Sequence, residues 1–134
     1  MLITKELIRI FTNWTKLKIR LHVAEREIFP HEREIWWASL GQNVGVEING
    51  KNDNFERPVL IIKKFNDQML LILPLTGKTK EEKYYYQFKG ADERFGSVVL
   101  SQIRLISSKR LIRKVGEVSE NDFLEIKRKT KGLF

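Results

Sequence analysis

The sequence predicts a mainly β fold with helices, of the α+β class: a small SH3-like barrel with a helix at each end. Three observations predict it. Apolar residues recur at helical spacing over 3–24, several short β-rich segments fill 35–106, and a second helical pattern follows Ser119. With 134 residues, 42% of them hydrophobic, the chain can bury a substantial core. We expect two parts, a helical extension at 1–32 and a barrel domain with its C-terminal helix at 33–134.

The composition narrows the kinds of site that the chain can build. It has no cysteine and two histidines, so a disulfide, a thiolate zinc site and a histidine-rich metal centre are not expected. No glycine-rich nucleotide loop stands out, and we expect neither metal nor cofactor. Apolar runs fall short of the roughly 20 residues that a membrane-spanning helix needs, and charges interrupt the N-terminal region too often for a signal peptide. The prediction is a soluble cytoplasmic protein with no membrane partner.

The charge balance favours a polyanionic partner. Lysine and arginine total 25 against 17 acidic residues, which gives a net charge of +8. Basic side chains displace counterions from phosphates, although solubility alone also explains a positive balance. The basic residues gather in two segments, 104–114 and 127–131, and such patches matter more than totals for nucleic-acid binding.

Residues 3–24 carry an amphipathic helical pattern, and Phe29-Pro30 marks the end of the helical region. Its apolar stripe has eight members: Ile3, Leu7, Ile10, Phe11, Trp14, Leu17, Leu21 and Ala24. We expect this stripe to pack on the rest of the domain. The basic opposite face leaves a second interpretation, a helix that lies on a membrane surface or against a partner.

Strands are expected between residues 35 and 106. Ile35 to Leu40 is a short strand, and 84–88 and 98–106 are further strands. The stretch 41–56 is rich in glycine and asparagine and is long for a connection, which is typical of a functional or disordered loop.

Two apolar strands, 57–62 and 70–76, form a hairpin in the middle of the chain. Both of their faces are apolar in mid-strand, which predicts burial at the centre of a barrel or under a covering helix. A turn centred on Asn66-Asp67 places Arg57 opposite Thr76, with Cβ atoms about 5 Å apart. A guanidinium beside a hydroxyl at the rim of an apolar sheet suits a phosphate. A three-residue turn would shift the register by one and separate the pair.

The C-terminal helix has a recognisable start. Ser119 followed by Asp122 matches a capping box before Phe123, Leu124 and Ile126. Basic residues occupy its last turns, where they suit the helix dipole.

Five sequence blocks occur in order: Trp36-Trp37-Ala38-Ser39-Leu40, Gly45-Val46-Glu47-Ile48-Asn49-Gly50, Arg57-Pro58-Val59-Leu60-Ile61-Ile62, Pro74-Leu75-Thr76 and Leu100-Ser101-Gln102-Ile103-Arg104. Together they resemble the MazF/PemK family of toxin ribonucleases over roughly residues 33–130. The resemblance implies an SH3-like barrel with a C-terminal helix, a homodimer, metal-independent cleavage of single-stranded RNA and inhibition by a small cognate antitoxin. The family's arginine, threonine and Gln-x-Arg element fall on Arg57, Thr76, and Gln102 with Arg104.

Metal-free RNA cleavage uses the ribose 2′-hydroxyl as the nucleophile, and the enzyme must stabilise charge on the phosphorane oxygens. Arg57 suits this task because a guanidinium is planar, charged and bidentate. Thr76 can donate a hydrogen bond to a non-bridging oxygen. Glu47 is the candidate general base, or alternatively it holds the loop or Arg57 in place.

The candidate RNA contacts are Asn49 and Lys51 in the glycine-rich loop, Lys78 after Thr76, and Gln102 and Arg104. Placed two apart on one strand, Gln102 and Arg104 would share a face. Gln102 could read a base edge, and Arg104 could hold a phosphate, stack on a base or pair with a surface carboxylate.

Two departures from the family pattern bear on catalysis. Six residues, 51–56, separate Gly50 from Arg57, and Ser101 stands where many relatives carry an acid. Two other classes of function stay open from the sequence: a non-catalytic nucleic-acid-binding SH3-like barrel, and an interaction module whose groove binds a partner peptide.

Overall fold

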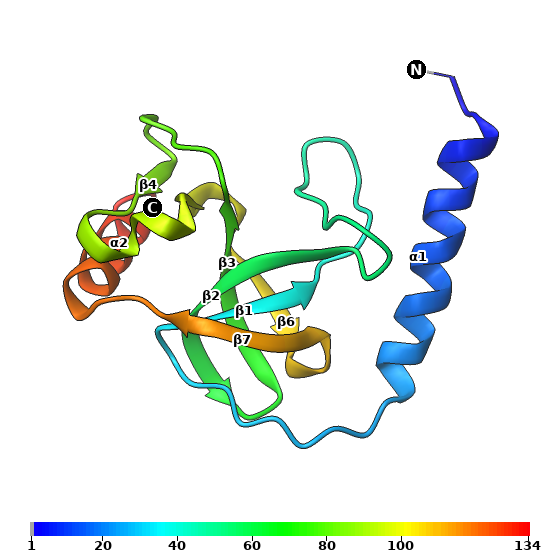
Figure 1. The fold of residues 1–134 in the computed structure, drawn as a ribbon, viewed down its shortest axis with the longest axis horizontal. Coiled ribbons are helices and arrows are strands. Elements are labelled where there is room, and N and C mark those ends of the chain that lie inside the picture. Colours follow the sequence, from blue (N-terminus) through cyan, green and yellow to red (C-terminus); the bar gives the residue numbers. More distant parts are fainter. Residues whose placement is uncertain (1) are drawn as a thin grey trace.

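A computed structural model describes residues 2–134, except for the side chain of Ala91. Two α-helices flank a β-rich body (Figure 1). The helices and strands are α1 (Lys5–Val23), β1 (Glu34–Ser39), β2 (Glu56–Asn66), β3 (Met69–Thr76), β4 (Tyr85–Gln87), β5 (Ser97–Val99), β6 (Arg104–Ser107), β7 (Leu111–Glu117) and α2 (Glu120–Lys131). Three short 3₁₀ turns join them: η1 (Gly90–Phe95), η2 (Leu100–Gln102) and η3 (Ser108–Arg110).

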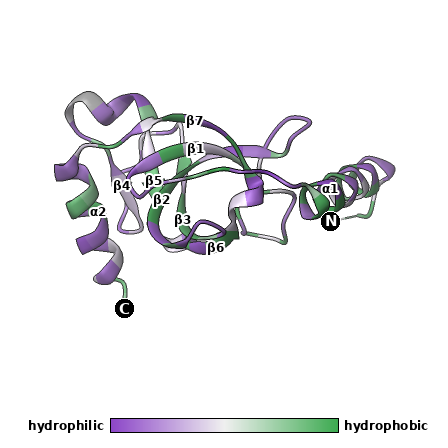
Figure 2. Cartoon of the chain, turned by 90° about the horizontal axis from the view of Figure 1, so that it is seen from below, coloured by the Kyte–Doolittle hydropathy of each residue, from purple (hydrophilic) through white to green (hydrophobic). Residues whose placement is uncertain are grey.

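The strands form one antiparallel sheet in the order β4-β5-β3-β2-β1-β7, and β6 pairs with the remaining part of the β3 edge. The sheet curls on itself, with α2 across one side (Figures 1 and 2). The predicted α+β class is therefore confirmed. Over residues 2–134, neither helix contains a stretch both long and apolar enough to cross a membrane.

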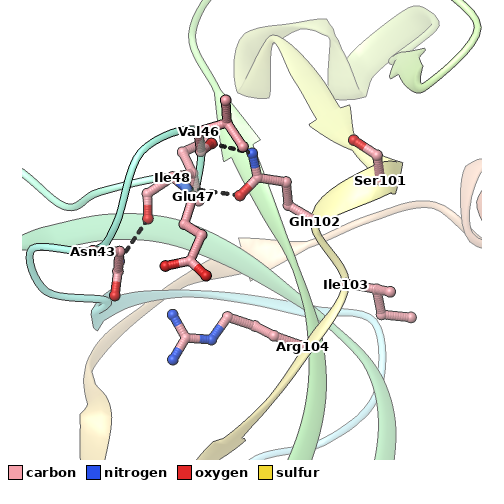
Figure 3. Close-up of a pocket in the computed structure, with 8 residues that line it drawn as sticks. All are labelled: Asn43, Val46, Glu47, Ile48, Ser101, Gln102, Ile103 and Arg104. Atoms are coloured by element: carbon pink, nitrogen blue, oxygen red, sulfur yellow. Dashed lines mark hydrogen bonds between the residues drawn. The ribbon is translucent and has the colours of Figure 1, made fainter.

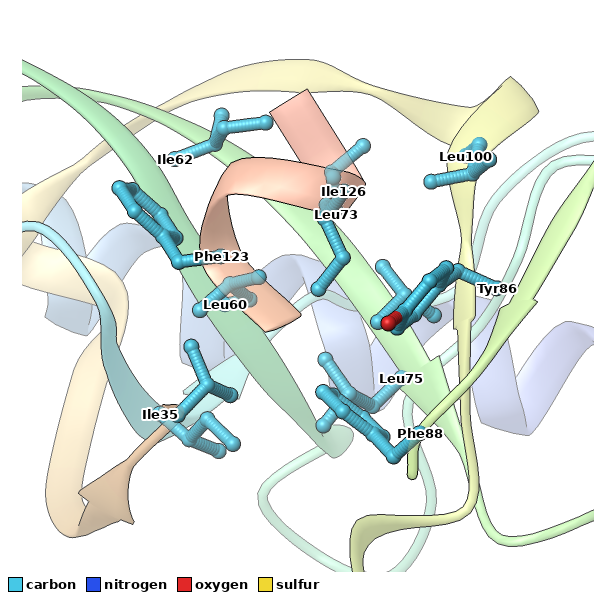
Figure 4. Packing of buried hydrophobic residues seen from close by; sticks show 12 residues of the cluster. Ile35, Leu60, Ile62, Leu73, Leu75, Tyr86, Phe88, Leu100, Phe123 and Ile126 are labelled. Carbon is cyan, nitrogen blue, oxygen red and sulfur yellow. The ribbon is translucent and has the colours of Figure 1, made fainter. Parts of the chain in front are cut away.

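Both faces of the β2–β3 hairpin are buried, as the sequence predicted. One face contributes Leu60 and Leu73 to a cluster that includes Phe123 and Ile126 of α2 (Figure 4). The other face forms a second cluster with residues of β1, β6 and β7. Burying a leucine or isoleucine contributes about 1.5–3 kcal/mol, so these two clusters are the main source of the barrel's stability.

The hairpin turn lies one residue later than predicted. Asn66 pairs with Met69, so the turn residues are Asp67 and Gln68, and not Asn66 and Asp67. Two register shifts in β2, between Ile61 and Lys63 and between Lys64 and Asn66, then restore the predicted mid-strand register, in which Val59 faces Pro74. Such bulges increase local twist and bend a strand, which suits a tightly curved sheet.

The strand predicted over 98–106 is interrupted by η2. Residues of β5 pair with β4 and with the end of β3, whereas β6 pairs with the beginning of β3. The chain must cross between these two positions, and the 3₁₀ turn makes the crossing. Gln102 therefore ends η2 while Arg104 begins β6, so the prediction that they share one strand was wrong. Strand β7 was not predicted.

Helix α1 forms as predicted, and its apolar stripe is partly covered. Thr4 caps the helix, because its hydroxyl accepts from the backbone N–H of Leu7 at 3.1 Å. Within α1 Trp14 alone is buried, whereas Phe11 is 37% exposed, and Ile3 just before the helix is 80% exposed. The prediction that the stripe packs on the rest of the domain is therefore confirmed at Trp14. Five more members of the stripe are half-buried: Leu7, Ile10, Leu17, Leu21 and Ala24. Helix α1 stands beside the barrel (Figures 1 and 2).

Trp14 anchors α1 to the body. Its ring lies 5.6 Å from the ring of Phe55, and the guanidinium of Arg110 lies 5.6 Å above it. A Cβ on Gly41 would come within 2.3 Å of the Trp14 ring, and Gly41 also has a φ of +94°. Glycine therefore meets both a backbone and a steric requirement at this contact. The ammonium of Lys109 adds a hydrogen bond to the carbonyl oxygen of His22 at the end of the helix.

The predicted N-cap of α2 is confirmed, but Asp92, and not Asp122, supplies the reciprocal bond of the capping box. The hydroxyl of Ser119 accepts from the backbone N–H of Asp122 at 3.1 Å. Asp122 also accepts from the hydroxyl of Tyr86 at 2.5 Å, and Asp92 accepts from the Ser119 backbone N–H at 2.9 Å. These bonds fix the start of α2 against β4 and η1.

Candidate active site

Arg57 lies near the start of β2 and bridges two parts of the chain. Its Nε donates to the carbonyl oxygen of Asn49 at 2.7 Å, and its Nη1 donates to the carbonyl oxygen of Leu75 at 3.1 Å. Leu75 immediately precedes Thr76, so the guanidinium and Thr76 come to the same end of the hairpin. The backbone pairing of β2 with β3 ends at Val59–Pro74. Beyond that point the Arg57 side chain connects the two strands through its bond to the Leu75 carbonyl.

The guanidinium of Arg57 is held before any ligand arrives. Burial lowers its pKa from the usual range, although an arginine with a lowered pKa stays protonated at neutral pH. Two of its five N–H groups are used by the two carbonyls, and Nη2 has no hydrogen-bond partner among the described residues. That nitrogen can therefore bind an anion without breaking an existing bond.

Thr76 ends β3 and is half-buried. Its hydroxyl oxygen accepts from the backbone N–H of Lys78 at 3.4 Å. A hydroxyl can accept and donate at once, so this contact leaves its proton for a ligand. Lys78 is exposed.

A cavity of about 620 Å³ opens beside the loop 41–55 (Figure 3). We call it the site cavity. Glu47, from the loop, and Arg104, from β6, point toward each other across it without forming an ion pair. It is lined by Asn43, Val46, Glu47, Ile48, Ser101, Gln102, Ile103 and Arg104. The cavity thus brings together three of the predicted site residues, although two of them were expected on one strand.

Glu47 also braces its own turn. Its carboxylate accepts from the backbone N–H of Val44 at 2.9 Å, and its backbone N–H donates to the Val44 carbonyl at 3.0 Å. The residue is exposed. One carboxylate oxygen therefore has a structural contact while the group as a whole faces the site cavity.

Gln102 holds the loop from the opposite wall. Its amide oxygen accepts from the backbone N–H of Ile48 at 2.7 Å, and its amide nitrogen donates to the carbonyl of Val46 at 2.9 Å. Each polar atom of the side chain makes one bond, so a second N–H and a second lone pair remain for a ligand.

Asn49 is part of the internal bracing of the loop. Its side chain accepts from the backbone N–H of Asn43 at 2.5 Å, and its carbonyl oxygen accepts from Arg57. Lys51 is exposed, and its backbone bridges to Glu56. Neither Lys51 nor Lys78 lines the site cavity.

Sequence reasoning missed two residues that shape this region. Asn43 donates from its side chain to the Ile48 carbonyl at 2.8 Å and closes the loop. The available sequence signal for Asn43 was its position between Gly41 and Gly45, which is typical of a tight loop. Arg110 donates to the Ser39 carbonyl at 3.1 Å, and burial, followed by the charge of Arg104, lowers its pKa. A lone arginine in a basic run carries no signal of burial.

No group of three or more metal-ligating side chains occurs within the part of the chain that the structure describes. The candidate groups lie in two places: Arg57 and Thr76 at the end of β3, and Glu47 and Arg104 at the site cavity, which neither Arg57 nor Thr76 lines. Such groups can bind a phosphodiester and move its protons.

The family model for the PemK-like, MazF-like toxin of type II toxin–antitoxin systems matches residues 31–134. Among solved structures, MazF from Deinococcus radiodurans is similar with a TM-score of 0.67 and 18% identity, covering 80% of this chain and 97% of that one.

Two structures described as mycobacterial are also similar. An endoribonuclease is 16% identical with a TM-score of 0.60, covering 81% of this chain and 93% of that one. An endoribonuclease in complex with its cognate antitoxin is 16% identical with a TM-score of 0.61, covering 77% and 92%. No curated protein matches the chain significantly. At these identities the structures show a shared fold, while the family match covers well over half of the sequence: the chain belongs to the PemK-like, MazF-like family of type II toxin–antitoxin toxins.

Proposed function

We propose that this toxin is an endoribonuclease that cleaves single-stranded RNA without a metal ion. The observation that carries the proposal is the position of Arg57. Two backbone carbonyls hold its guanidinium between the loop and the end of β3, next to Thr76, with Nη2 left for a ligand. A preorganised cation of this kind can stabilise charge that develops in a transition state without first reorganising.

In the proposed reaction the ribose 2′-oxygen attacks the adjacent phosphorus and the bond to the 5′-oxygen breaks. The products are a 2′,3′-cyclic phosphate and a 5′-hydroxyl. Arg57 stabilises the phosphorane oxygens, and its lowered pKa makes it a better proton donor to the leaving oxygen than an ordinary arginine. Thr76 donates to a non-bridging oxygen. Glu47 takes the 2′-proton, or else acts by bracing the loop.

The RNA contacts that we propose surround this centre. Arg104 projects into the site cavity, where it can hold a phosphate or stack on a base. Lys51 and Lys78 are exposed and can pair with phosphates. Asn49 and Gln102 brace the loop and meet RNA through the donors and acceptors that these contacts leave.

The partners are also part of the proposal. An endoribonuclease of a mycobacterial species has been solved with its cognate antitoxin, and MazF of D. radiodurans with MazE. We propose that a small antitoxin inhibits this chain as well, that the chain forms a homodimer, that it acts in the cytoplasm, and that 1–32 is an extension of a 33–134 core domain.

Incubation of the purified protein with single-stranded RNA in EDTA tests the enzyme proposal. Arg57→Ala should slow cleavage by about 10²–10³-fold, which is typical for loss of one oxyanion-stabilising group. Arg128→Ala is a matched control, because Arg128 is an exposed arginine on α2 that pairs with Glu125. If wild type and Arg57→Ala give the same background cleavage, the enzyme proposal fails.

A second candidate function is a nucleic-acid-binding barrel without catalysis. Arg104 in the site cavity and the exposed Lys51 and Lys78 support it, because basic side chains can hold RNA without catalysis. In this case RNA affinity falls steeply with salt while no cleavage occurs. Absence of measurable affinity at low salt would exclude both RNA functions.

A further inference from the structure

A second cavity, of about 460 Å³, lies between α1 and the loop 41–55. We call it the α1 cleft. We propose that it is an RNA-backbone subsite, which binds phosphates of nucleotides outside the cleavage step. The proposal rests on the proposed action on RNA and deepens it, because α1 precedes the residues that the family model matches.

The helix presents a line of cations to the cleft. Arg9, Lys16 and Arg20 all line it, and their spacing of seven and then four residues puts them on one helical stripe. At 1.5 Å per residue the stripe extends about 16 Å along the helix axis. This length suits several consecutive phosphates, and a single small anion would use only part of it.

Two of these cations are free to bind. Lys16 and Arg20 form no hydrogen bond or ion pair with any described residue. Arg9 instead donates hydrogen bonds to the Glu6 carboxylate, and these bonds, together with the charge of the cleft residue Asp53, raise the pKa of Arg9. Positive charge is therefore uncompensated at the Lys16–Arg20 end of the α1 cleft.

The cleft is built on a fixed helix. Trp14, 6% exposed, is seated against Phe55 and over Gly41, and Lys109 ties the C-terminal end of α1 through the His22 carbonyl. The helix backbone that carries the cations is therefore in place before a ligand binds, although the exposed side chains of Lys16 and Arg20 still become ordered on binding.

The α1 cleft and the site cavity share the loop as a common wall. Gln42 lines the cleft and its neighbour Asn43 lines the site cavity, while Gly50 and Ile48 do the same at the other end of the loop. Figure 1 shows this loop rising between the barrel and α1. A single-stranded RNA that crosses the loop from the site cavity can thus continue into the α1 cleft.

The lining favours RNA over an acidic peptide. Three amide side chains, from Asn13, Gln42 and Asn52, line the cleft, and amides offer both donors and acceptors to base edges. A bound peptide usually needs apolar pockets for its anchor residues. The apolar lining here is limited to Ile10 and Phe55, and Phe55 is already packed on Trp14.

Binding of 2′-O-methyl RNA, which has no free 2′-hydroxyl and cannot be cleaved, tests the proposal. Lys16→Ala combined with Arg20→Ala should weaken binding of a strand of about 20 nucleotides roughly tenfold, and the penalty should be smaller for a strand of about 6 nucleotides. The slope of log affinity against log salt should become shallower by about 1.4, since each single-strand phosphate contact contributes about 0.7. Lys127→Ala with Lys131→Ala removes the same charge on α2, at the other end of the molecule (Figure 1), and should leave the length dependence unchanged.

Each result decides the question. The α1 pair is Lys16→Ala with Arg20→Ala, and the α2 pair is Lys127→Ala with Lys131→Ala. If both pairs change RNA affinity and its length dependence equally while wild type cleaves unmodified RNA, the subsite is refuted and the enzyme proposal stands. If wild type binds RNA through the α1 pair but cleaves none, the subsite stands and the catalytic proposal fails. If the α1 pair lowers affinity for an oligo-glutamate peptide and leaves RNA binding intact, the α1 cleft belongs to an acidic protein partner and the subsite is refuted.

Discussion

Replacement of Trp14 by alanine should release α1 from the barrel without unfolding the barrel. Neither hydrophobic cluster contains a residue of α1, and Trp14 is the one buried residue of that helix. A buried tryptophan removes about 150–250 Å² from water, which corresponds to roughly 4–6 kcal/mol at about 25 cal/mol per Å². Measured costs of Trp→Ala changes are about 3–5 kcal/mol.

Once undocked, the helix should also fray, because isolated helices of this length are marginal in water. Hydrogen exchange followed by mass spectrometry separates the two parts of the chain. In Trp14→Ala, amides of α1 should exchange at least about 100-fold faster, while the amides of β2 and β3 stay within about threefold of wild type.

Phe11→Ala is the control, because Phe11 is an aromatic residue of the same helix that is 37% exposed. It should change exchange little. Gly41→Ala disrupts the same contact, since its Cβ would lie 2.3 Å from the indole of Trp14. It should therefore speed the exchange of the α1 amides as Trp14→Ala does. The reasoning is refuted if α1 keeps its protection in Trp14→Ala, or if β2 and β3 lose theirs in parallel.

Three further predictions concern the site and the start of α2. Arg57→Lys keeps the charge but loses the planar fork, so single-turnover cleavage should fall by about tenfold or more, and a rate equal to wild type would contradict the assigned role. Gln102→Ala removes both bonds to the loop and should speed hydrogen exchange at 43–49, whereas unchanged exchange there would show that Gln102 does not hold the loop. Burial, followed by the hydrogen bond with Asp92, raises the pKa of Asp122, so the folded state binds this proton more tightly than the unfolded state, and the contribution of Asp122 to stability declines as pH rises above about 4. Urea unfolding of Asp122→Asn should lack that part of the decline, and identical pH profiles would exclude the linkage.

The pKa of Asp92, beside Asp122, is shifted in the opposite direction. Burial acts to raise its pKa, but hydrogen bonds from Asp122 and from the Ser119 backbone lower it overall. Its contribution to stability is therefore present above its ordinary pKa and is lost at more acidic pH. The pKa values of Asp92 and Asp122 are thus shifted apart at the start of α2, which is why the neutral asparagine at 122 tests the coupling.

Local sequence determined much of the hairpin. The alternation in 57–62 and 70–76 identified both buried faces, because a strand's side chains alternate with a period of two whatever covers them. The mid-strand register was also correct, and with it the approach of Arg57 to the Thr76 end of β3. The turn position was missed because two bulges in β2 compensated for a shift of the turn, and no local pattern signals a compensating pair.

Only the tertiary structure decided which parts of the chain pack against each apolar face and which strands pair. Periodicity defined an apolar stripe on α1, but it could not indicate that Trp14 alone becomes fully buried, because Gly41 and Phe55 form the contact surface for its ring. The break at η2 follows from β5 and β6 pairing with different parts of the β3 edge.

The same limit applies to the candidate site. The family-like blocks named Arg57, Glu47 and Gln102 from the sequence, yet they could not indicate that Gln102 braces the loop or that α1 adds a basic cleft behind it. Residue types and their spacing are properties of short stretches of the chain, so motifs can be identified from the sequence. Hydrogen bonds across 54 residues, as between Ile48 and Gln102, exist only once the whole barrel has closed.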